Sequence, residues 1–326
     1  MIYDRYYYLL EKKLNSLFSD SNLNPAELYS PQQYIISLGG KRLRPLLALI
    51  SADLFGVDFR KAMPAALCVE LFHNFSLIHD DILDKAPLRR GKQTVHKKWN
   101  TDIAILSGDA MLVRAYIELN QAESNIKDKL IRLFNKTAIE VCEGQQEDMN
   151  FESMEHVSVD QYTSMITKKT AVLLACGLEM GAISANASDK DCRLIYNCGK
   201  HLGIAFQLKD DVLDVFADQK MFGKQTGGDI ISNKKTFLLL KAIALANKKQ
   251  RADLKNWISK KKFSKKEKVK AIIHIYNQLN IKEISENEIN KHFNSALRSL
   301  DKIKNIDTSK KENFRKFCID LMLREK

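Results

Sequence analysis

Apolar residues recur at steps of three and four along almost the whole chain, and this period restricts the fold more than any other feature. Segments such as AALCVELFHNFSLIHDDILD and IYNCGKHLGIAFQLKDDVLDVF keep the spacing over several helical turns. The 326 residues include only 13 Gly and 5 Pro, too few for the many turns of an all-β protein. The sequence therefore predicts an all-α protein made of long helices.

Glycine, proline and short polar residues interrupt this pattern at four places, where turns and helix caps are expected. The breaks are SLGGKRLRP (37–45), KAPLRRGKQTV (85–95), SANASDKD (184–191) and FGKQTGGDIISNKK (222–235). No stretch between them has the composition of a flexible linker, and no repeat is evident. We therefore expect one domain over 1–326, with more polar helices over 245–326.

Charge and cysteine content narrow the class of protein further. The formal net charge is +12, and much of it lies in the lysine-rich run at 248–270. Because no nucleic-acid-binding signature accompanies that run, we interpret it as a solvated helical surface.

No segment approaches the roughly 18 apolar residues of a membrane span, so stable membrane insertion is not expected. The charged N-terminal stretch lacks the core of a signal peptide, which predicts a cytoplasmic protein. Six cysteines without a CxxC pair predict free thiols.

Two carboxylate motifs, LIHDDILD (77–84) and LKDDVLD (208–214), lie inside apolar helical segments. Positions i and i+4 of a helix share one face, so Asp80 lies beside Asp84, and Asp210 beside Asp214. Like charges at this spacing are destabilising unless a cation lies between them. Oxygen ligands with water in the remaining positions suit Mg²⁺ best. The two motifs therefore predict magnesium sites.

The alternative interpretation is a solvated acidic face, and the surrounding residues disfavour it. Apolar side chains flank both motifs and leave little of either helix for water. Antiparallel packing in a helical bundle would bring the two motifs face to face. The middle residues, Asp81 and Asp211, are turned by about 100° and are expected to act behind the metal ligands.

Cations at three of the breaks predict a diphosphate clamp, because metal held by few carboxylates commonly bridges to phosphate. These cations are Lys41, Arg42, Arg44, Arg89, Arg90 and Lys224. The first three lie at a glycine-rich turn that is expected to enter a helix through Pro45, where backbone N–H groups also favour an anion.

With these motifs the sequence resembles the trans-type isoprenyl diphosphate synthases, also called polyprenyl synthetases. The resemblance rests on GGKRLRP, ELFHNFSLIHDDILD, PLRRGKQTVH, TKKTA, GIAFQLKDDVLD and FGKQTGGDI, in that order, over roughly residues 35–240. One departure is that FGKQTGGDI is one residue longer than the family's usual spacing. The resemblance implies an all-α bundle of the isoprenoid synthase type around a central cavity, forming a homodimer.

The resemblance also implies a transferase activity and a set of site residues. The enzyme would condense an allylic diphosphate (dimethylallyl, geranyl or farnesyl) with isopentenyl diphosphate, head to tail, using three Mg²⁺ ions. Implied metal ligands are Asp80, Asp84 and Asp210; implied catalytic residues are Lys169, Thr170 and Gln207. Arg89, Lys169, Lys224 and Lys234 would hold the allylic diphosphate, and Lys41, Arg44, His73 and Arg90 the isopentenyl diphosphate. Gln145 and Asp148 would assist the metals, whereas His79 and His96 are interpreted as structural.

Product length is predicted from the residues that precede the first acidic motif. Phe75 and Ser76 lie five and four positions before Asp80, on the helix along which the growing tail would descend. The aromatic ring at Phe75 resembles the floor of the short-chain enzymes, and small Ser76 leaves more room than the paired aromatics of many farnesyl types. This resemblance implies a C20 product, geranylgeranyl diphosphate, with C15 farnesyl diphosphate as the alternative. A class I terpene cyclase, a squalene-synthase-like enzyme and a non-catalytic subunit are rivals. The spacing of both motifs, both complete, disfavours all three.

Overall fold

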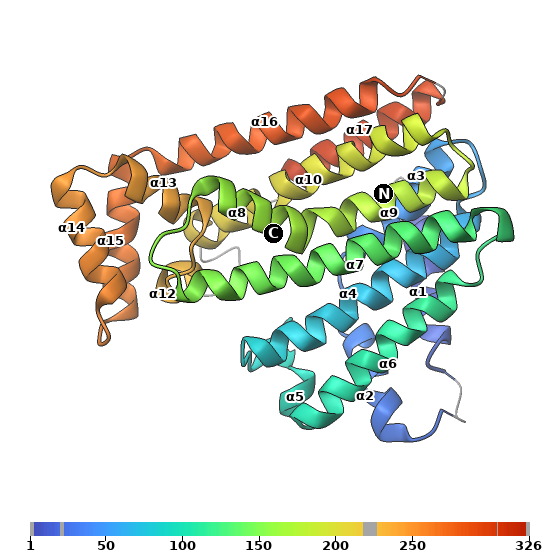
Figure 1. Cartoon of the computed structure of the whole chain (residues 1–326), viewed down its shortest axis with the longest axis horizontal. Coiled ribbons are helices and arrows are strands. Elements are labelled where there is room, and N and C mark those ends of the chain that lie inside the picture. The colour runs from blue at the N-terminus through green and yellow to red at the C-terminus, as the bar shows by residue number, and fades with distance from the viewer. Residues whose placement is uncertain (1–2, 20–22, 218–226, 305, 324–326) are drawn as a thin grey trace. The chain divides into compact units, whose positions relative to one another are not determined.

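The structure is a computed structural model of the chain, and it describes all residues except 1–2, 20–22, 218–226, 305 and 324–326. Figure 1 shows a molecule made almost wholly of helices. Within the described ranges the only sheet is a hairpin of β1 (Leu88–Arg89) and β2 (Lys92–Gln93). The all-α prediction is confirmed, and the hairpin is an element that helical periodicity did not indicate.

The chain divides into two compact units, each assembled from separate stretches of sequence. Unit 1 contains residues 1–136, 176–196 and 303–314, and unit 2 contains 137–175, 197–302 and 315–326. Four helices contribute residues to both units: α7 (Ser124–Ser153), α9 (Val172–Ser184), α10 (Asp189–Phe216) and α17 (Thr308–Leu323).

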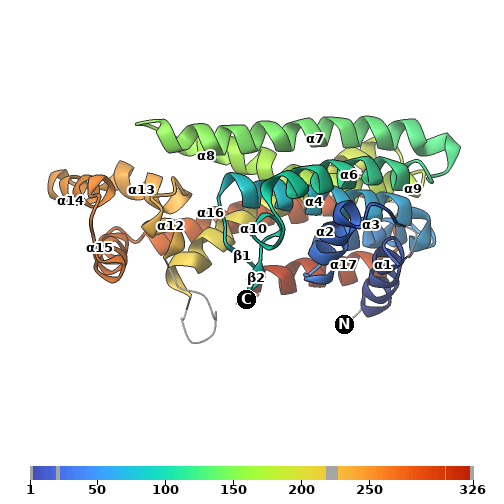
Figure 2. The same ribbon diagram turned by 90° about the horizontal axis from the view of Figure 1, so that it is seen from below.

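Unit 1 also contains the N-terminal helices and the helix that carries the first acidic motif. Its further elements are α1 (Asp4–Ser16), α2 (Ala26–Ser37), α3 (Leu43–Leu54), η1 (Phe59–Ala62), α4 (Met63–Leu83), α5 (Val95–Lys98) and α6 (Thr101–Leu119). Helix α4 lies alongside α6, as Figures 1 and 2 both show. Helix α9 approaches α3 so closely that a Cβ on Gly181 would lie 2.2 Å from the Ala48 carbonyl oxygen. Only glycine permits this approach.

Unit 2 carries the second acidic motif and most of the C-terminal helices. Its further elements are α8 (Val159–Ile166), η2 (Thr167–Ala171), α12 (Gly228–Ile231), α13 (Phe237–Leu245), α14 (Lys248–Ser259), α15 (Lys265–Gln278) and α16 (Ile281–Asp301). A core of buried apolar side chains joins α8, α10, α13, α15 and α16. Lys268 is buried against it, and its ammonium group donates to the Ile231 carbonyl oxygen and to Asn233. One buried cation thereby caps the short helix α12.

Three of the four predicted helix breaks agree with the observed element ends. For the first three breaks, α2 ends at Ser37, α4 at Leu83 and α9 at Ser184. At the fourth, α10 already ends at Phe216, part of the break lies outside the described residues, and the short helix α12 lies within it. Helix α3 begins at Leu43, not at Pro45, because Arg42 adopts a left-handed conformation (φ 46°) and serves as the N-cap. All six cysteines are free thiols. Among the described residues, no helix is both long and apolar enough to cross a bilayer.

Candidate active site

The first acidic motif occupies the last turn of α4 in unit 1. The Asp84 N–H donates to the Asp80 carbonyl oxygen at 2.8 Å, so the helical turn continues to Asp84 and keeps the two residues on one face. Asp80 is half-buried and Asp84 is exposed. Asp81 points to another side, is 1 % exposed, and accepts hydrogen bonds from Nε and Nη2 of Arg89, both at 2.8 Å. This bidentate pair fixes the guanidinium plane of Arg89 against Asp81.

The hairpin after α4 sets the position of Arg90. Arg90 and Gly91 both have positive φ values (52° and 74°), the combination that a two-residue type I′ turn requires. The turn brings the Arg90 guanidinium against the glycine-rich turn, where a Cβ on Gly40 would lie 2.8 Å from Nη2 of Arg90. The φ of 142° at Gly40 favours glycine at this position, and the absence of a side chain leaves room for the Arg90 guanidinium.

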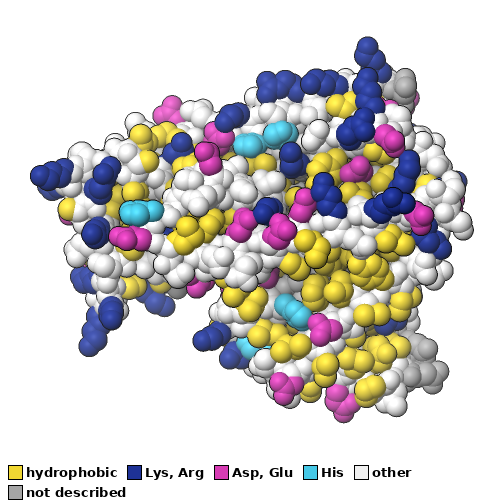
Figure 3. Space-filling model, viewed as in Figure 1, with side chains coloured by type: hydrophobic (Ala, Val, Ile, Leu, Met, Phe, Trp, Pro, Cys, Tyr) yellow, Lys and Arg dark blue, Asp and Glu magenta, His cyan; other side chains and the backbone are white. Residues whose placement is uncertain are grey.

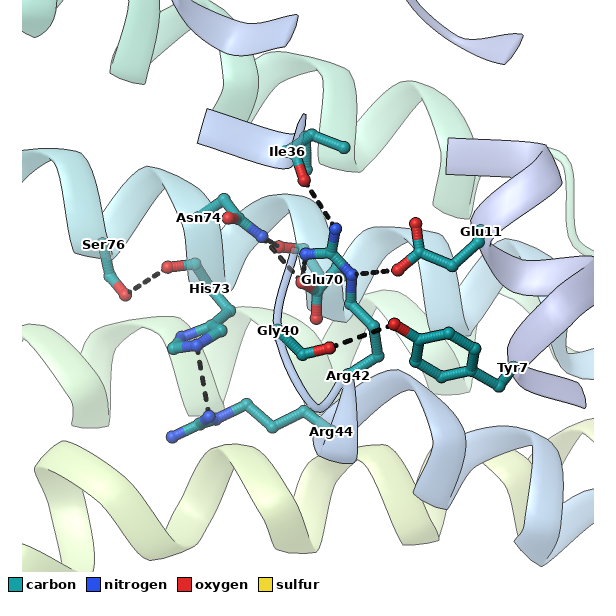
Figure 4. A network of polar contacts seen from close by, with 10 residues as sticks. All are labelled: Tyr7, Glu11, Ile36, Gly40, Arg42, Arg44, Glu70, His73, Asn74 and Ser76. Atoms are coloured by element: carbon teal, nitrogen blue, oxygen red, sulfur yellow. Dashed lines mark hydrogen bonds and ion pairs between the residues drawn. The ribbon is translucent and has the colours of Figure 1, made fainter. Parts of the chain in front are cut away.

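Arg42 does not belong to the diphosphate clamp that its neighbours suggested. Its side chain is fully buried and donates to Glu11 of α1, Glu70 of α4 and the Ile36 carbonyl oxygen, each at 2.7 Å. Asn74 donates to the same Glu70 oxygen at 2.8 Å (Figure 4). The prediction for Arg42 is wrong, because its guanidinium is buried and already paired with two carboxylates.

Arg44 and His73 lie together on neighbouring helices, α3 and α4, as the sequence prediction for a common anion site requires. Nη1 of Arg44 lies 3.2 Å from Nε2 of His73 (Figure 4). Burial, together with the positive charge of Arg44, lowers the pKa of His73 well below its usual value. The imidazole is therefore neutral, and because arginine only donates, Nε2 accepts and Nδ1 carries the proton.

The second acidic motif lies near the end of α10 in unit 2, and its middle residue is again turned inward. Asp211 is 3 % exposed and accepts hydrogen bonds from the Tyr162 hydroxyl and from Nε2 of Gln207, the latter at 3.0 Å. Oε1 of Gln207 in turn accepts from the Thr170 hydroxyl at 3.1 Å. Burial, reinforced by Asp229, raises the pKa of Asp211 to about 7.

Lys169 and Thr170 lie in η2, a single π-helical turn between α8 and α9. Such turns insert one extra residue into a helix and frequently mark functional sites. Nζ of Lys169 binds Asp148 at 2.6 Å. The π turn packs directly on Gly144 of α7, where an added Cβ would lie 2.3 Å from the backbone nitrogen of Lys169. Gly144 thus lets α7 bring Asp148 up to Lys169.

A further acidic residue of unit 2, Asp229, lies close to the second motif. Its backbone N–H donates to Oδ2 of Asp214 at 3.0 Å. Burial raises the pKa of Asp229, and the nearby Lys234 opposes that effect. The Lys234 N–H donates to the Asp229 carbonyl oxygen at 2.9 Å. Lys234 therefore lies beside Asp229, whereas Lys224 lies outside the described residues.

The two predicted chain-length residues, Phe75 and Ser76, lie on α4, about one turn before Asp80. The Phe75 ring contacts Phe72 and His79, with centroids 5.5 and 4.7 Å apart. Phe72 in turn meets Phe134 of α7 edge to face at 5.3 Å. The hydroxyl of Ser76 donates to the His73 carbonyl oxygen at 2.8 Å.

Each unit therefore brings together part of the predicted site. Unit 1 groups Arg44 with His73, and Arg90 with Gly40; unit 2 groups Thr170 with Gln207. Sequence reasoning missed Tyr162, Asp229 and Gly144. Only Asp229 had a usable signal, because it lies within the quoted FGKQTGGDI segment. Among the described residues, no cluster of three or more His, Cys, Asp or Glu side chains is arranged to hold a metal by itself.

Comparison with known proteins identifies relatives that cover both units. A crystal structure of geranylgeranyl pyrophosphate synthase superposes with a TM-score of 0.93, at 43% identity over 98% of both chains. Geranylgeranyl diphosphate synthase of Sulfolobus acidocaldarius is 35% identical over 92% of each chain. The enzyme of the same name from Methanosarcina mazei is 41% identical over 67% of this chain and 68% of its own.

The polyprenyl synthetase family model matches residues 25–276, which include every motif quoted above. Structural neighbours with the helical bundle of isoprenyl diphosphate synthases cover nearly the whole chain. This protein therefore belongs to the polyprenyl synthetase family, whose members are trans-prenyltransferases.

Proposed function

We propose that the protein is a geranylgeranyl diphosphate synthase, which joins an allylic diphosphate to isopentenyl diphosphate head to tail and stops at C20. The observation that carries this proposal is the 35% identity to the Sulfolobus acidocaldarius enzyme over 92% of both chains. That similarity extends through both acidic motifs and all the basic segments. Farnesyl diphosphate remains the second candidate product, because Phe75 supplies a bulky floor close to Asp80.

Asp80, Asp84 and Asp210 would hold the three Mg²⁺ ions. The donors fit this metal, because all are carboxylates. Each acidic motif supplies too few ligands to fill the coordination shell of an ion, which leaves positions for water and diphosphate. A further acceptor is available on α7, where the buried Oε1 of Gln145 has no hydrogen-bond partner among the described residues. When bound, the ions would neutralise the departing diphosphate as Lewis acids.

Arg89, Lys169 and Lys234 would bind the allylic diphosphate, together with Lys224. Their acidic partners support this role. Arg89 is oriented by Asp81, and Lys169 by Asp148, so each cation is already aligned before an anion arrives. Preorganised charges of this kind need little rearrangement as negative charge develops on the leaving group.

Lys41, Arg44, His73 and Arg90 would bind isopentenyl diphosphate. The neutral imidazole of His73 suits a site with several cations, because a protonated ring would add repulsion beside Arg44. Thr170 and Gln207 would face the allylic carbon, where their oxygens stabilise the developing positive charge. The proton lost after carbon–carbon bond formation would leave with the diphosphate, since no side-chain base is evident among the implied site residues.

Purified protein with Mg²⁺, isopentenyl diphosphate and dimethylallyl, geranyl or farnesyl diphosphate tests the proposal, with product length read by mass. We expect all three starters to yield mainly C20. Products ending at C15 would support the farnesyl alternative. A cyclic hydrocarbon formed from an allylic diphosphate alone would identify a cyclase, and no turnover with any starter would identify a non-catalytic subunit.

Replacing Phe75 with alanine is expected to lengthen the main product by one or more C5 units. Phe75 stands about one helical turn below Asp80, and its removal would open the path as far as Phe72 and Phe134. Product mass with farnesyl diphosphate as starter is the measurement, and Phe75→Tyr, which keeps the ring, is the control. A C20 product from Phe75→Ala would show that the floor lies elsewhere.

We also propose a homodimer that pairs through α6. One face of α6 packs on α4, while Leu106, Val113 and Ile117 on another face are 61, 58 and 54 % exposed. Figure 3 shows apolar side chains gathered over this helix. A continuous exposed apolar stripe marks an interaction surface, and a second copy offers an identical stripe for a two-fold contact.

Charging this stripe should separate the two copies. We expect Val113→Lys with Ile117→Lys to convert a dimer into a monomer, because both lysines would be buried opposite their own copies. Sedimentation velocity at micromolar concentration measures the change. The control is Leu245→Lys, which alters an apolar residue of α13 that is 52 % exposed. A wild-type monomer, or an unchanged dimer in the double variant, would contradict the proposal.

A further inference from the structure

Four side chains of unit 2 form a continuous hydrogen-bonded chain that ends at the proposed reaction centre. Tyr162 of α8 donates to one oxygen of Asp211, and Gln207, one turn earlier on α10, donates to the other at 3.0 Å. Oε1 of Gln207 accepts from Thr170 at 3.1 Å. Of these four residues, the resemblance to known synthases assigns a role only to Gln207 and Thr170.

The direction of every bond in this chain is set from its buried end. When Asp211 is ionised, both of its oxygens accept, and the Gln207 amide turns its NH₂ group toward Asp211 and its carbonyl toward Thr170. The Thr170 hydrogen is then used on Gln207. The Thr170 hydroxyl oxygen therefore offers only lone pairs to a substrate. An amide in the opposite orientation would accept nothing from Thr170 and would turn its NH₂ group toward the threonine oxygen.

This direction matters for the chemistry of the proposed function. A developing allylic cation is stabilised by oxygen lone pairs and destabilised by donor hydrogens. We propose that Tyr162, acting through Asp211, is a positioning residue that orients the Gln207 amide and thereby keeps the lone pairs of Thr170 available to the allylic cation. The inference rests on the proposed synthase activity.

Packing alone does not require the Tyr162 hydroxyl. The ring is 2 % exposed within the apolar core of unit 2, where phenylalanine would fill the same space. A buried hydroxyl without a partner is costly, so a tyrosine here is favoured by its bond to Asp211. Burial also raises the pKa of Tyr162 well above its usual value, which keeps the phenol protonated as a donor.

A double-mutant cycle with Tyr162→Phe and Gln207→Leu tests the proposal, measured with Mg²⁺, isopentenyl diphosphate and farnesyl diphosphate. Tyr162→Phe should lower kcat about tenfold, roughly what one misdirected hydrogen bond is worth, with KM for both substrates changed less than about twofold. In the Gln207→Leu background the same change should have no further effect on kcat. The control Tyr276→Phe, which removes a phenol of equal burial from the same core, should leave kcat unchanged.

If the kcat losses of the two single variants multiply in the double variant, the proposal is wrong, because the free-energy effects of independent sites are additive. An unchanged kcat in Tyr162→Phe would also overturn it. If Tyr162→Phe does not fold, Asp211→Asn applies the same test, since its NH₂ group competes with that of Gln207, and normal turnover in that variant would be equally decisive. Absence of turnover in the wild type would instead reject the synthase function itself.

Discussion

Replacing Asp80 or Asp210 with alanine is expected to lower kcat/KM by about 10³-fold or more while the fold remains intact. A metal ion that stabilises the charge of a leaving group contributes several kcal/mol to the transition state, and each ~1.4 kcal/mol is tenfold in rate. Stability in the absence of metal should not fall. Asp80 shares its helix face with Asp84, and removing one of two neighbouring like charges relieves repulsion.

Two measurements separate loss of metal binding from loss of structure. Steady-state turnover gives the activity, and thermal unfolding with and without Mg²⁺ plus inorganic pyrophosphate gives the stabilisation by ligand. The wild type should melt higher with the ligands, and the alanine variants should lose that rise. Exposed aspartates supply matched controls: Asp128→Ala in unit 1 and Asp253→Ala in unit 2. Near-normal turnover in either Asp80→Ala or Asp210→Ala would remove that residue from the metal site.

The fold could be predicted from the sequence wherever local chemistry decides it. Apolar periodicity indicated the helices, and the glycine-rich and polar segments marked their ends. The hairpin at Leu88–Gln93 was not predicted, because its signal is a two-residue turn in which arginine takes a positive φ beside Gly91. The early start of α3 depends similarly on the left-handed backbone of Arg42, which tertiary ion pairs hold in place.

The candidate site divides in the same way. The arrangement within each acidic motif follows from the local sequence, because i and i+4 spacing on a helix fixes a common face whatever the rest of the chain does. Tyr162 and Gly144 depend on contacts with residues far along the chain, Asp211 and Lys169, so no sequence window contains both partners. The π turn at Thr167–Ala171 is also invisible to periodicity, because it adds a residue without changing the apolar character of the segment.

Replacing Arg42 is expected to lower the free energy of unfolding strongly. Its guanidinium and the Glu70 carboxylate are 0 and 2 % exposed, and they are 2.7 Å apart. Arg42→Ala would leave Glu70 buried without its cation, which typically costs about 3–5 kcal/mol. The midpoint of urea unfolding measures this loss. Arg60→Ala is the control, because it breaks an arginine–aspartate pair on the surface of the same unit and should change the midpoint little.

The same variant should also weaken the proposed isopentenyl diphosphate site. Arg42 ties the turn at Gly39–Gly40 to α1 and α4, and that turn carries Lys41 and receives Arg90. We therefore expect KM for isopentenyl diphosphate to rise several-fold more than KM for the allylic substrate. The double variant Arg42→Met with Glu70→Met removes both charges and should recover most of the stability, since a buried ion pair is often replaceable by apolar side chains. Because the turn would still lack its ion pairs, the KM defect should persist in that variant. Recovery of KM together with stability would mean that Arg42 holds the fold and not the substrate turn.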